Sequence, residues 1–301
     1  MSFANVCIHA YAVGYGTIAY NHVVYGKYEP ALHSNPFQRR GTRPNPPFPD
    51  LDKRTGRPAR SSAGLTQYSR LTIVLDKDNL VNSGTGLVSA NSNALLEYDL
   101  LSVMPMTENA FQHACITLSE LKPFSIDIIT LDLASAPRLP FHLRRSTVGA
   151  AIANGVVFEI CYGPAVDTRN VSNDTRDSGT LRRNLFSNTR DLLRITNGKG
   201  VILSSGAKEA LGLRGPYDVM NLATVLGMTM TSAKNAMRET CRSLVLRAQT
   251  RQTFRGAISG LSIQPANRDA EPTETTPIDT TTSALPLPSQ RKRKLGLIDA
   301  E

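Results

Sequence analysis

Short apolar runs alternate with amphipathic stretches along most of this sequence, and this alternation is the feature that most restricts its fold. The runs predict six strands, at residues 17–22, 71–75, 100–104, 126–133, 156–161 and 201–203. Because a helix or a long loop follows each run, the strands are expected to be parallel and joined by right-handed crossovers. We therefore predict an α/β fold of the TIM-like (β/α) barrel type, with a doubly wound sheet as the alternative. A helix over residues 4–13 precedes the first strand, so the barrel is expected to be incomplete at its amino terminus.

The stretch from Gly198 to Asp218 combines several features of a ligand-binding strand end. An apolar run at 201–203 is followed by small residues at 204–207, and Lys208 and Arg214 come next. Pro216 suits the first turn of a new helix. Ligands approach the carboxyl end of parallel strands, so cations at this edge favour a phosphate-bearing partner. The alternative is a basic loop that only faces solvent.

The composition points to a polyanionic partner. The chain has 301 residues and a formal net charge of +9. Such a charge favours binding to nucleic acid or to an anionic membrane. No apolar run approaches the length of a membrane-spanning helix, and the amino terminus lacks the pattern of a secretory signal. The four cysteines are far apart in sequence, which predicts free thiols in a reducing compartment.

Basic residues gather at several points of the predicted fold. In the helix expected at 179–196, Leu185 and Leu192 fall on one face, whereas Arg183, Arg190 and Arg194 fall on the other. The last helical region is also rich in arginine. Charge and placement predict these RNA contacts: Arg144, Arg145, Arg183, Arg190, Lys199, Lys208, Arg214, Arg251 and Arg255. The alternative for each is a solvated surface cation.

Two segments have compositions that do not suit a packed core. Residues 27–69 are rich in Pro, Arg and Asn, which predicts an extended or partly disordered insertion loop. Residues 262–301 are rich in Pro, Thr, Ser and Glu and are expected to form a disordered tail after a barrel domain of residues 1–261. The tail carries Arg291, Lys292, Arg293 and Lys294, a compact basic run typical of nuclear import signals.

The acidic and imidazole side chains give a weak case for a metal-dependent hydrolase. Asp127 and Asp132 lie near the two ends of one predicted strand, yet aspartates at strand ends more often anchor loops by hydrogen bonds. Metal-dependent phosphoesterases need clustered His, Asp and Glu side chains from several strand ends. The chain has no His-x-His pair, so we expect no catalytic residues and no metal or other cofactor bound by this chain. A protein-interaction module that contacts little RNA is a third possibility.

Several stretches together resemble one known family, the thirty-kilodalton protein subunit of eukaryotic nuclear ribonuclease P and ribonuclease MRP. They cover roughly residues 10 to 260 and include Tyr20-Asn21-His22, Leu131-Asp132-Leu133, residues 138–141, 148–152, 158–165, 213–222 and 235–251. The sequence departs from the family in lacking its opening strand and in the length of the 27–69 insertion.

The resemblance implies a TIM-like barrel within a ribonucleoprotein that removes the 5′ leader of precursor tRNA, and within the related particle that processes ribosomal RNA. It also implies that the RNA component, using Mg²⁺, is the catalyst, and that this chain binds and stabilises it. The implied partners are the ribonuclease P and MRP RNAs and other protein subunits, one of them small, in the nucleus and its nucleolus and without a membrane.

Overall fold

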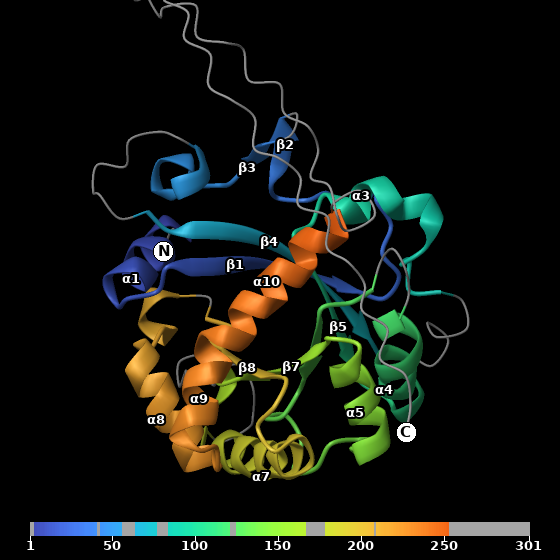
Figure 1. The fold of residues 1–301 in the computed structure, drawn as a ribbon, viewed down its shortest axis with the longest axis vertical. Helices are drawn as coiled ribbons and strands as arrows, with labels where there is room; N and C mark the ends of the chain where they lie inside the picture. The colour runs from blue at the N-terminus through green and yellow to red at the C-terminus, as the bar shows by residue number, and fades with distance from the viewer. Residues whose placement is uncertain are drawn as a thin grey trace, which may run out of the picture. The chain divides into compact units, whose positions relative to one another are not determined.

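Six parallel strands form the main sheet of the computed structural model (Figure 1). They are β1 (Thr17–Tyr25), β4 (Thr66–Leu75), β5 (Leu100–Pro105), β6 (Ile128–Leu131), β7 (Val157–Cys161) and β8 (Val201–Ser204). The structure describes residues 3–40, 43–55, 64–76, 84–120, 125–166, 178–207 and 209–252, all of which belong to one unit spanning Met1–Leu261.

The order of the strands identifies the type of α/β fold. Each of these six strands pairs with the next of the six along the sequence, in the order β1-β4-β5-β6-β7-β8, and every pair is parallel. A doubly wound sheet reverses its order at a switch point, whereas a barrel does not. Over the described residues β1 and β8 do not pair with each other, so the sheet is a curled half-barrel. The predicted barrel-type fold is confirmed, and the doubly wound alternative is excluded.

The helices follow the strands much as the sequence predicts. They are α1 (Phe3–Ala12), α3 (Ser92–Leu96), α4 (Glu108–His113) with a π-helical continuation (Ala114–Leu118), α5 (Arg145–Ala153), α6 (Gly163–Val166), α7 (Ser178–Thr196), α8 (Pro216–Leu226), α9 (Met230–Met237) and α10 (Glu239–Gln252).

Local chemistry explains several of these helix boundaries. The Thr107 side chain accepts a hydrogen bond from the Ala110 amide and begins α4. Pro216 begins α8, and Gly227 ends it with a left-handed φ of 111°. None of the described helices is long and apolar enough to cross a membrane.

The two faces of the sheet bury different side chains. On the outer face, Leu71, Val103, Ile129, Phe158 and Leu203 belong to the large core beneath the surrounding helices. On the inner, concave face, the residues that form a second apolar cluster with α10 are Leu100, Ile128, Val157, Ile202, Leu244 and Ala248. In Figure 1, α10 runs diagonally across the sheet. The last described helix therefore covers the concave face, where a closed barrel would have its interior.

The described part of the 27–69 segment packs against the sheet, so the prediction of an extended loop is wrong for these residues. It contains a two-stranded antiparallel ladder, β2 (Gln38–Arg40) with β3 (Arg43–Asn45), and two short 3₁₀ turns at Pro49–Leu51 and Lys53–Thr55. The Phe37 ring lies 5.5 Å from that of Tyr20 on β1, and Phe48 lies 6.4 Å from it. Burial of these aromatic rings outweighs the loop-like average composition of the segment.

Candidate nucleic-acid interface

Six of the nine predicted RNA contacts are exposed cations in the structure: Arg144, Arg145, Arg183, Arg190, Lys199 and Arg214. The topology separates them into two groups. Arg144, Arg145, Arg183 and Arg214 lie near the carboxyl edge of the sheet, in or just after the segments that leave β6, β7 and β8. Arg190 and Lys199 lie nearer the amino edge, toward the end of α7 and in the turn before β8. Of the other three predicted contacts, Lys208 and Arg255 lie outside the described residues, and Arg251 is not exposed. The predicted import signal, Arg291–Lys294, also lies outside the described residues.

Helix α7 carries a stripe of basic residues, and its opposite face is packed against the rest of the fold. Leu185 and Leu192 are buried, and the Asn188 side chain donates hydrogen bonds of 2.9 Å to the carbonyls of Leu133 and Ala136. Because these contacts fix the buried face of the helix, Arg183 and Arg190 are held on its solvent side. They are seven residues apart, which corresponds to about 10 Å along the helix axis. The predicted separation of faces in α7 is confirmed.

Arg144 and Arg145 stand where the chain enters α5. The loop before them is anchored by Phe141, which is buried and stacks on Phe111 with ring centroids 4.5 Å apart. At the start of this loop, the Asp132 carboxylate accepts hydrogen bonds from the amides of Ala134 and Ser135, at 3.3 and 3.0 Å. Apolar and acidic anchors therefore present the two arginines to solvent.

Arg214 lies in a loop that is fixed by tyrosines from elsewhere in the chain. The Tyr15 hydroxyl donates a 2.9 Å hydrogen bond to the Arg214 carbonyl, and the Arg214 amide donates to the Tyr162 hydroxyl at 3.4 Å. Burial raises the pKa of Tyr15, with further increases from the nearby Tyr162, so this hydroxyl remains a donor at neutral pH. The Arg214 guanidinium donates to the carbonyls of Leu211 and Leu213, which limits its freedom before any ligand binds.

Arg251 is an internal cation, in contrast to its predicted place among the RNA contacts. Its side chain is 7% exposed and pairs with the buried Asp127, which also pairs with Arg247 at 3.3 Å. Arg251 further donates to the carbonyls of Ser125 and Asp99, at the start of the neighbouring strands. These contacts hold α10 on the sheet, so we leave Arg251 out of the candidate interface.

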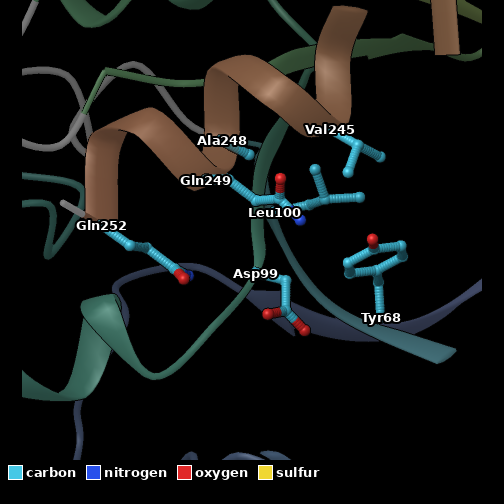
Figure 2. Close-up of a pocket in the computed structure, with 7 residues that line it drawn as sticks. All are labelled: Tyr68, Asp99, Leu100, Val245, Ala248, Gln249 and Gln252. Atoms are coloured by element: carbon cyan, nitrogen blue, oxygen red, sulfur yellow. The ribbon is translucent and has the colours of Figure 1, made fainter. Parts of the chain in front are cut away.

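The gap that remains between α10 and the sheet cannot hold a ligand. Figure 2 shows Val245, Gln249 and Gln252 of α10 close to Leu100, Asp99 and Tyr68. The gap has a volume of about 10 Å³, which is room for no more than one water molecule.

The concave face also holds a buried ion pair that sequence reasoning missed. Arg70 donates to both carboxylate oxygens of Glu159, at 2.6 and 2.5 Å, and to the hydroxyls of Ser102 and Thr130. Burial alone would raise the pKa of Glu159, but the charge of Arg70 and hydrogen bonds from Arg70, Thr130 and Ser204 outweigh it and lower the pKa to about 2. The available signal for this pair was that β4 and β7 each contain a single charged residue, and that the two charges are opposite.

The acidic side chains form anchors rather than a metal site within the described residues. Asp127 binds two arginines and the Leu101 amide, and Asp132 binds loop amides. No group of three His, Cys, Asp or Glu side chains that could hold a metal ion occurs in the part of the chain that the structure describes. The four cysteines lie within this part and are free thiols, as predicted.

Comparisons with known proteins identify the family of this chain. The family model described as RNase P subunit p30 matches residues 2–253. The mouse ribonuclease P protein subunit p30 is 36% identical over 204 residues, which cover 67% of this chain and 68% of the mouse protein. Probable ribonuclease P protein subunit 3 of Schizosaccharomyces pombe is 33% identical over 196 residues, which cover 64% of this chain and 72% of that protein.

A solved structure gives independent support for the fold. A chain of an archaeal ribonuclease P, determined with mature tRNA, has a TM-score of 0.55 at 11% sequence identity, over 90% of this chain and 97% of that chain. The likeness at this identity shows the fold alone. Together with the family match, it confirms the resemblance inferred from the sequence, and this chain belongs to the RNase P subunit p30 family.

Proposed function

We propose that this ribonuclease P subunit binds the RNA of the particle through its exposed cations and leaves bond cleavage to that RNA. The observation that carries the proposal is the arginine stripe of α7, which is held outward by a buried face and continues into Lys199. Neutralising phosphates with Lys and Arg releases counterions and provides most of the affinity in contacts of this kind. The chain has no tryptophan and 6% aromatic residues, which favours contacts to backbone and shape over extensive base stacking.

The concave face supports a non-catalytic role for this chain. In related barrels the active site uses clustered ionisable side chains at the strand ends. Here Glu159 is paired with Arg70, and Asp127 is paired with Arg251 of α10. The apolar side of α10 covers the part of the face that carries Leu100, Ile128, Val157 and Ile202. We therefore assign Mg²⁺ and the cleavage chemistry to the RNA component.

The partners and the location are proposed from the family. The archaeal structure was determined with mature tRNA, which supports a place for this chain beside precursor tRNA in the particle. We extend the proposal to the ribonuclease MRP RNA and to a small protein subunit as partners, because the family resemblance implies both. Arg291, Lys292, Arg293 and Lys294 support import into the nucleus, and we propose the nucleolus as the site of assembly.

A charge-neutralised variant tests the RNA contact. Arg183, Arg190, Lys199 and Arg214 are each replaced by Ala, and binding to the ribonuclease P RNA is measured over a range of salt concentrations. Loss of four phosphate contacts should weaken binding by at least about tenfold and reduce the salt slope by about 3 to 4.

The matched control removes four exposed cations from other surfaces, at Lys27, Lys234, Arg238 and Arg242. Both variants have the same net charge. If the control loses as much affinity and as much salt slope as the first variant, net charge rather than this surface explains binding, and the proposal is wrong.

A further inference from the structure

An open groove of about 1060 Å³ lies between the second half of α7 and the turn that joins α8 to α9. Single small ligands occupy pockets of about 300 to 1,000 Å³. This groove reaches the upper limit and is open to solvent, so its size suits a short length of polymer. The residues that define its walls are Arg190, Arg194, Asn197, Val225, Thr229 and Ser232.

The wall formed by α7 is cationic. Arg190 is exposed, and the Arg194 side chain is 78% exposed. Asp191 lies beside them, but its carboxylate is 3.6 Å from the Arg194 guanidinium, which is longer than a good hydrogen bond. An exposed pair at this distance is weak. Both arginines can therefore turn to an anionic ligand at little cost.

The opposite wall and the floor have different chemistry. Thr229 and Ser232 lie at the start of α9, where the Thr229 hydroxyl accepts a hydrogen bond from the Ser232 amide at 3.1 Å. The amino terminus of a helix carries a partial positive charge, so this wall has the same sign of charge as the arginines. On this side Val225 is 67% exposed, whereas Leu226 and Met228 at the floor are buried, so Val225 offers most of the apolar surface that a ligand can reach. A ligand that suits this groove has anionic groups along one side and flat apolar groups along the other.

We propose that the groove binds an unpaired segment of RNA, with backbone phosphates at Arg190 and Arg194 and a base against the exposed side chain of Val225. This inference rests on the proposed function. It adds to it the class of RNA element that binds and a second contact surface, formed by the turn between α8 and α9. In a duplex the base faces are stacked and unavailable to an apolar side chain such as Val225, whereas in a loop or bulge they are free, and guanidinium planes stack on them.

The first experiment compares a labelled single-stranded RNA of about twelve nucleotides with the same sequence annealed into a duplex. In the full chain, Arg190→Ala with Arg194→Ala should weaken single-strand binding by at least about tenfold and duplex binding by about threefold or less. The control, Arg238→Ala with Arg242→Ala, removes the same charge from exposed positions outside the groove and should leave both affinities within about twofold. Thermal unfolding establishes that each variant is folded.

The second experiment changes the groove without removing an arginine. Val225→Glu adds a negative charge at the rim and should weaken single-strand binding by about tenfold, whereas Tyr217→Glu, on the same helix and 80% exposed outside the groove, should not. Asp191→Asn removes the carboxylate beside Arg194 and should strengthen binding by about two- to fivefold.

The outcomes separate this inference from the proposed function. If single-strand and duplex binding fall equally in the Arg190 and Arg194 variant, or if Val225→Glu has no effect on RNA, the groove does not bind an unpaired segment even when the whole ribonuclease P RNA still binds. If Val225→Glu blocks incorporation into the particle and leaves RNA affinity intact, a protein occupies the groove, and the inference is wrong. If the unmodified chain binds no RNA at all, the proposed function itself fails.

Discussion

At the scale of single residues, the Arg70–Glu159 pair is a buried contact that is held from several strands. Both side chains are buried, and each has hydrogen bonds from neighbouring strands in addition to the pair itself. The Arg70 Nε atom nevertheless has no hydrogen-bond partner, so the network is not fully satisfied. Removing one member of such a pair leaves an unpaired charge in a medium of low polarity, which costs more than the pair contributes.

We expect Glu159→Gln to lower the free energy of unfolding by about 3 to 5 kcal/mol at pH 7. Since the folded pKa of Glu159 lies below its unfolded value, its stabilisation is fully present above the unfolded pKa and is lost as the pH falls toward about 2. The difference between the native chain and the variant, measured by urea unfolding, should therefore be smaller at pH 3 than at pH 7. Glu239→Gln, at an exposed carboxylate, serves as the control. A difference that does not change with pH would contradict this assignment.

At the scale of elements, α10 is held on the sheet by both charge and apolar contact. Leu244 and Ala248 pack on the concave face, and Arg247 and Arg251 bind Asp127 and the carbonyls at the start of β5 and β6. The Gln252 side chain donates to the Tyr98 carbonyl at 3.0 Å. A basic helix that looks like an RNA-binding surface in the sequence is thus partly an internal support.

Arg251→Ala should destabilise the fold by about 3 to 5 kcal/mol, because Asp127 loses its most buried partner. Arg242→Ala, at an exposed position of the same helix, should change stability by less than about 0.5 kcal/mol. Chemical unfolding of both variants measures the difference. An Arg251 variant that keeps full stability but loses RNA affinity in its folded state would restore this residue to the interface.

At the scale of the whole molecule, the described part of the chain is a half-barrel whose concave face is occupied by its own helix and whose outer cations face solvent. This arrangement separates a supporting interior from the exterior that carries the candidate interface. Enzymes that share the barrel place their chemistry at the carboxyl edge. Here that edge presents Arg214, which is held by two tyrosines and by backbone carbonyls.

The isolated chain should therefore be indifferent to divalent metals. Adding Mg²⁺ or Mn²⁺ at millimolar concentration, or removing metals with a chelator, should shift the melting temperature by less than about 2 °C, because the described residues form no cluster that could hold a metal ion in the folded state. The same samples should not cleave precursor tRNA. Stoichiometric metal binding by calorimetry, together with cleavage by the chain alone, would instead identify a metal-dependent phosphoesterase.

Much of the fold and part of the interface could be predicted from the sequence, for identifiable reasons. The strands and α7 were predicted because burial imposes a period on the sequence, as Leu185 and Leu192 show opposite Arg183 and Arg190. Arg251 was misassigned because the pattern gives the charge of a side chain but not the location of its partner Asp127, 124 residues away. The groove was missed because its walls come from separate helices, and only their packing brings Val225 near Arg194.

The position of α10 has a consequence for how the chain is made. The ribosome produces all six strands before the helix that covers their concave side. Until translation has passed Gln252, the apolar side chains of Leu100, Ile128, Val157 and Ile202 are left uncovered in the nascent chain. Such intermediates aggregate and recruit chaperones. Synthesis that stalls within the last fifty described residues should thus yield insoluble fragments, whereas completed chains should bury this strip within the first moments after release.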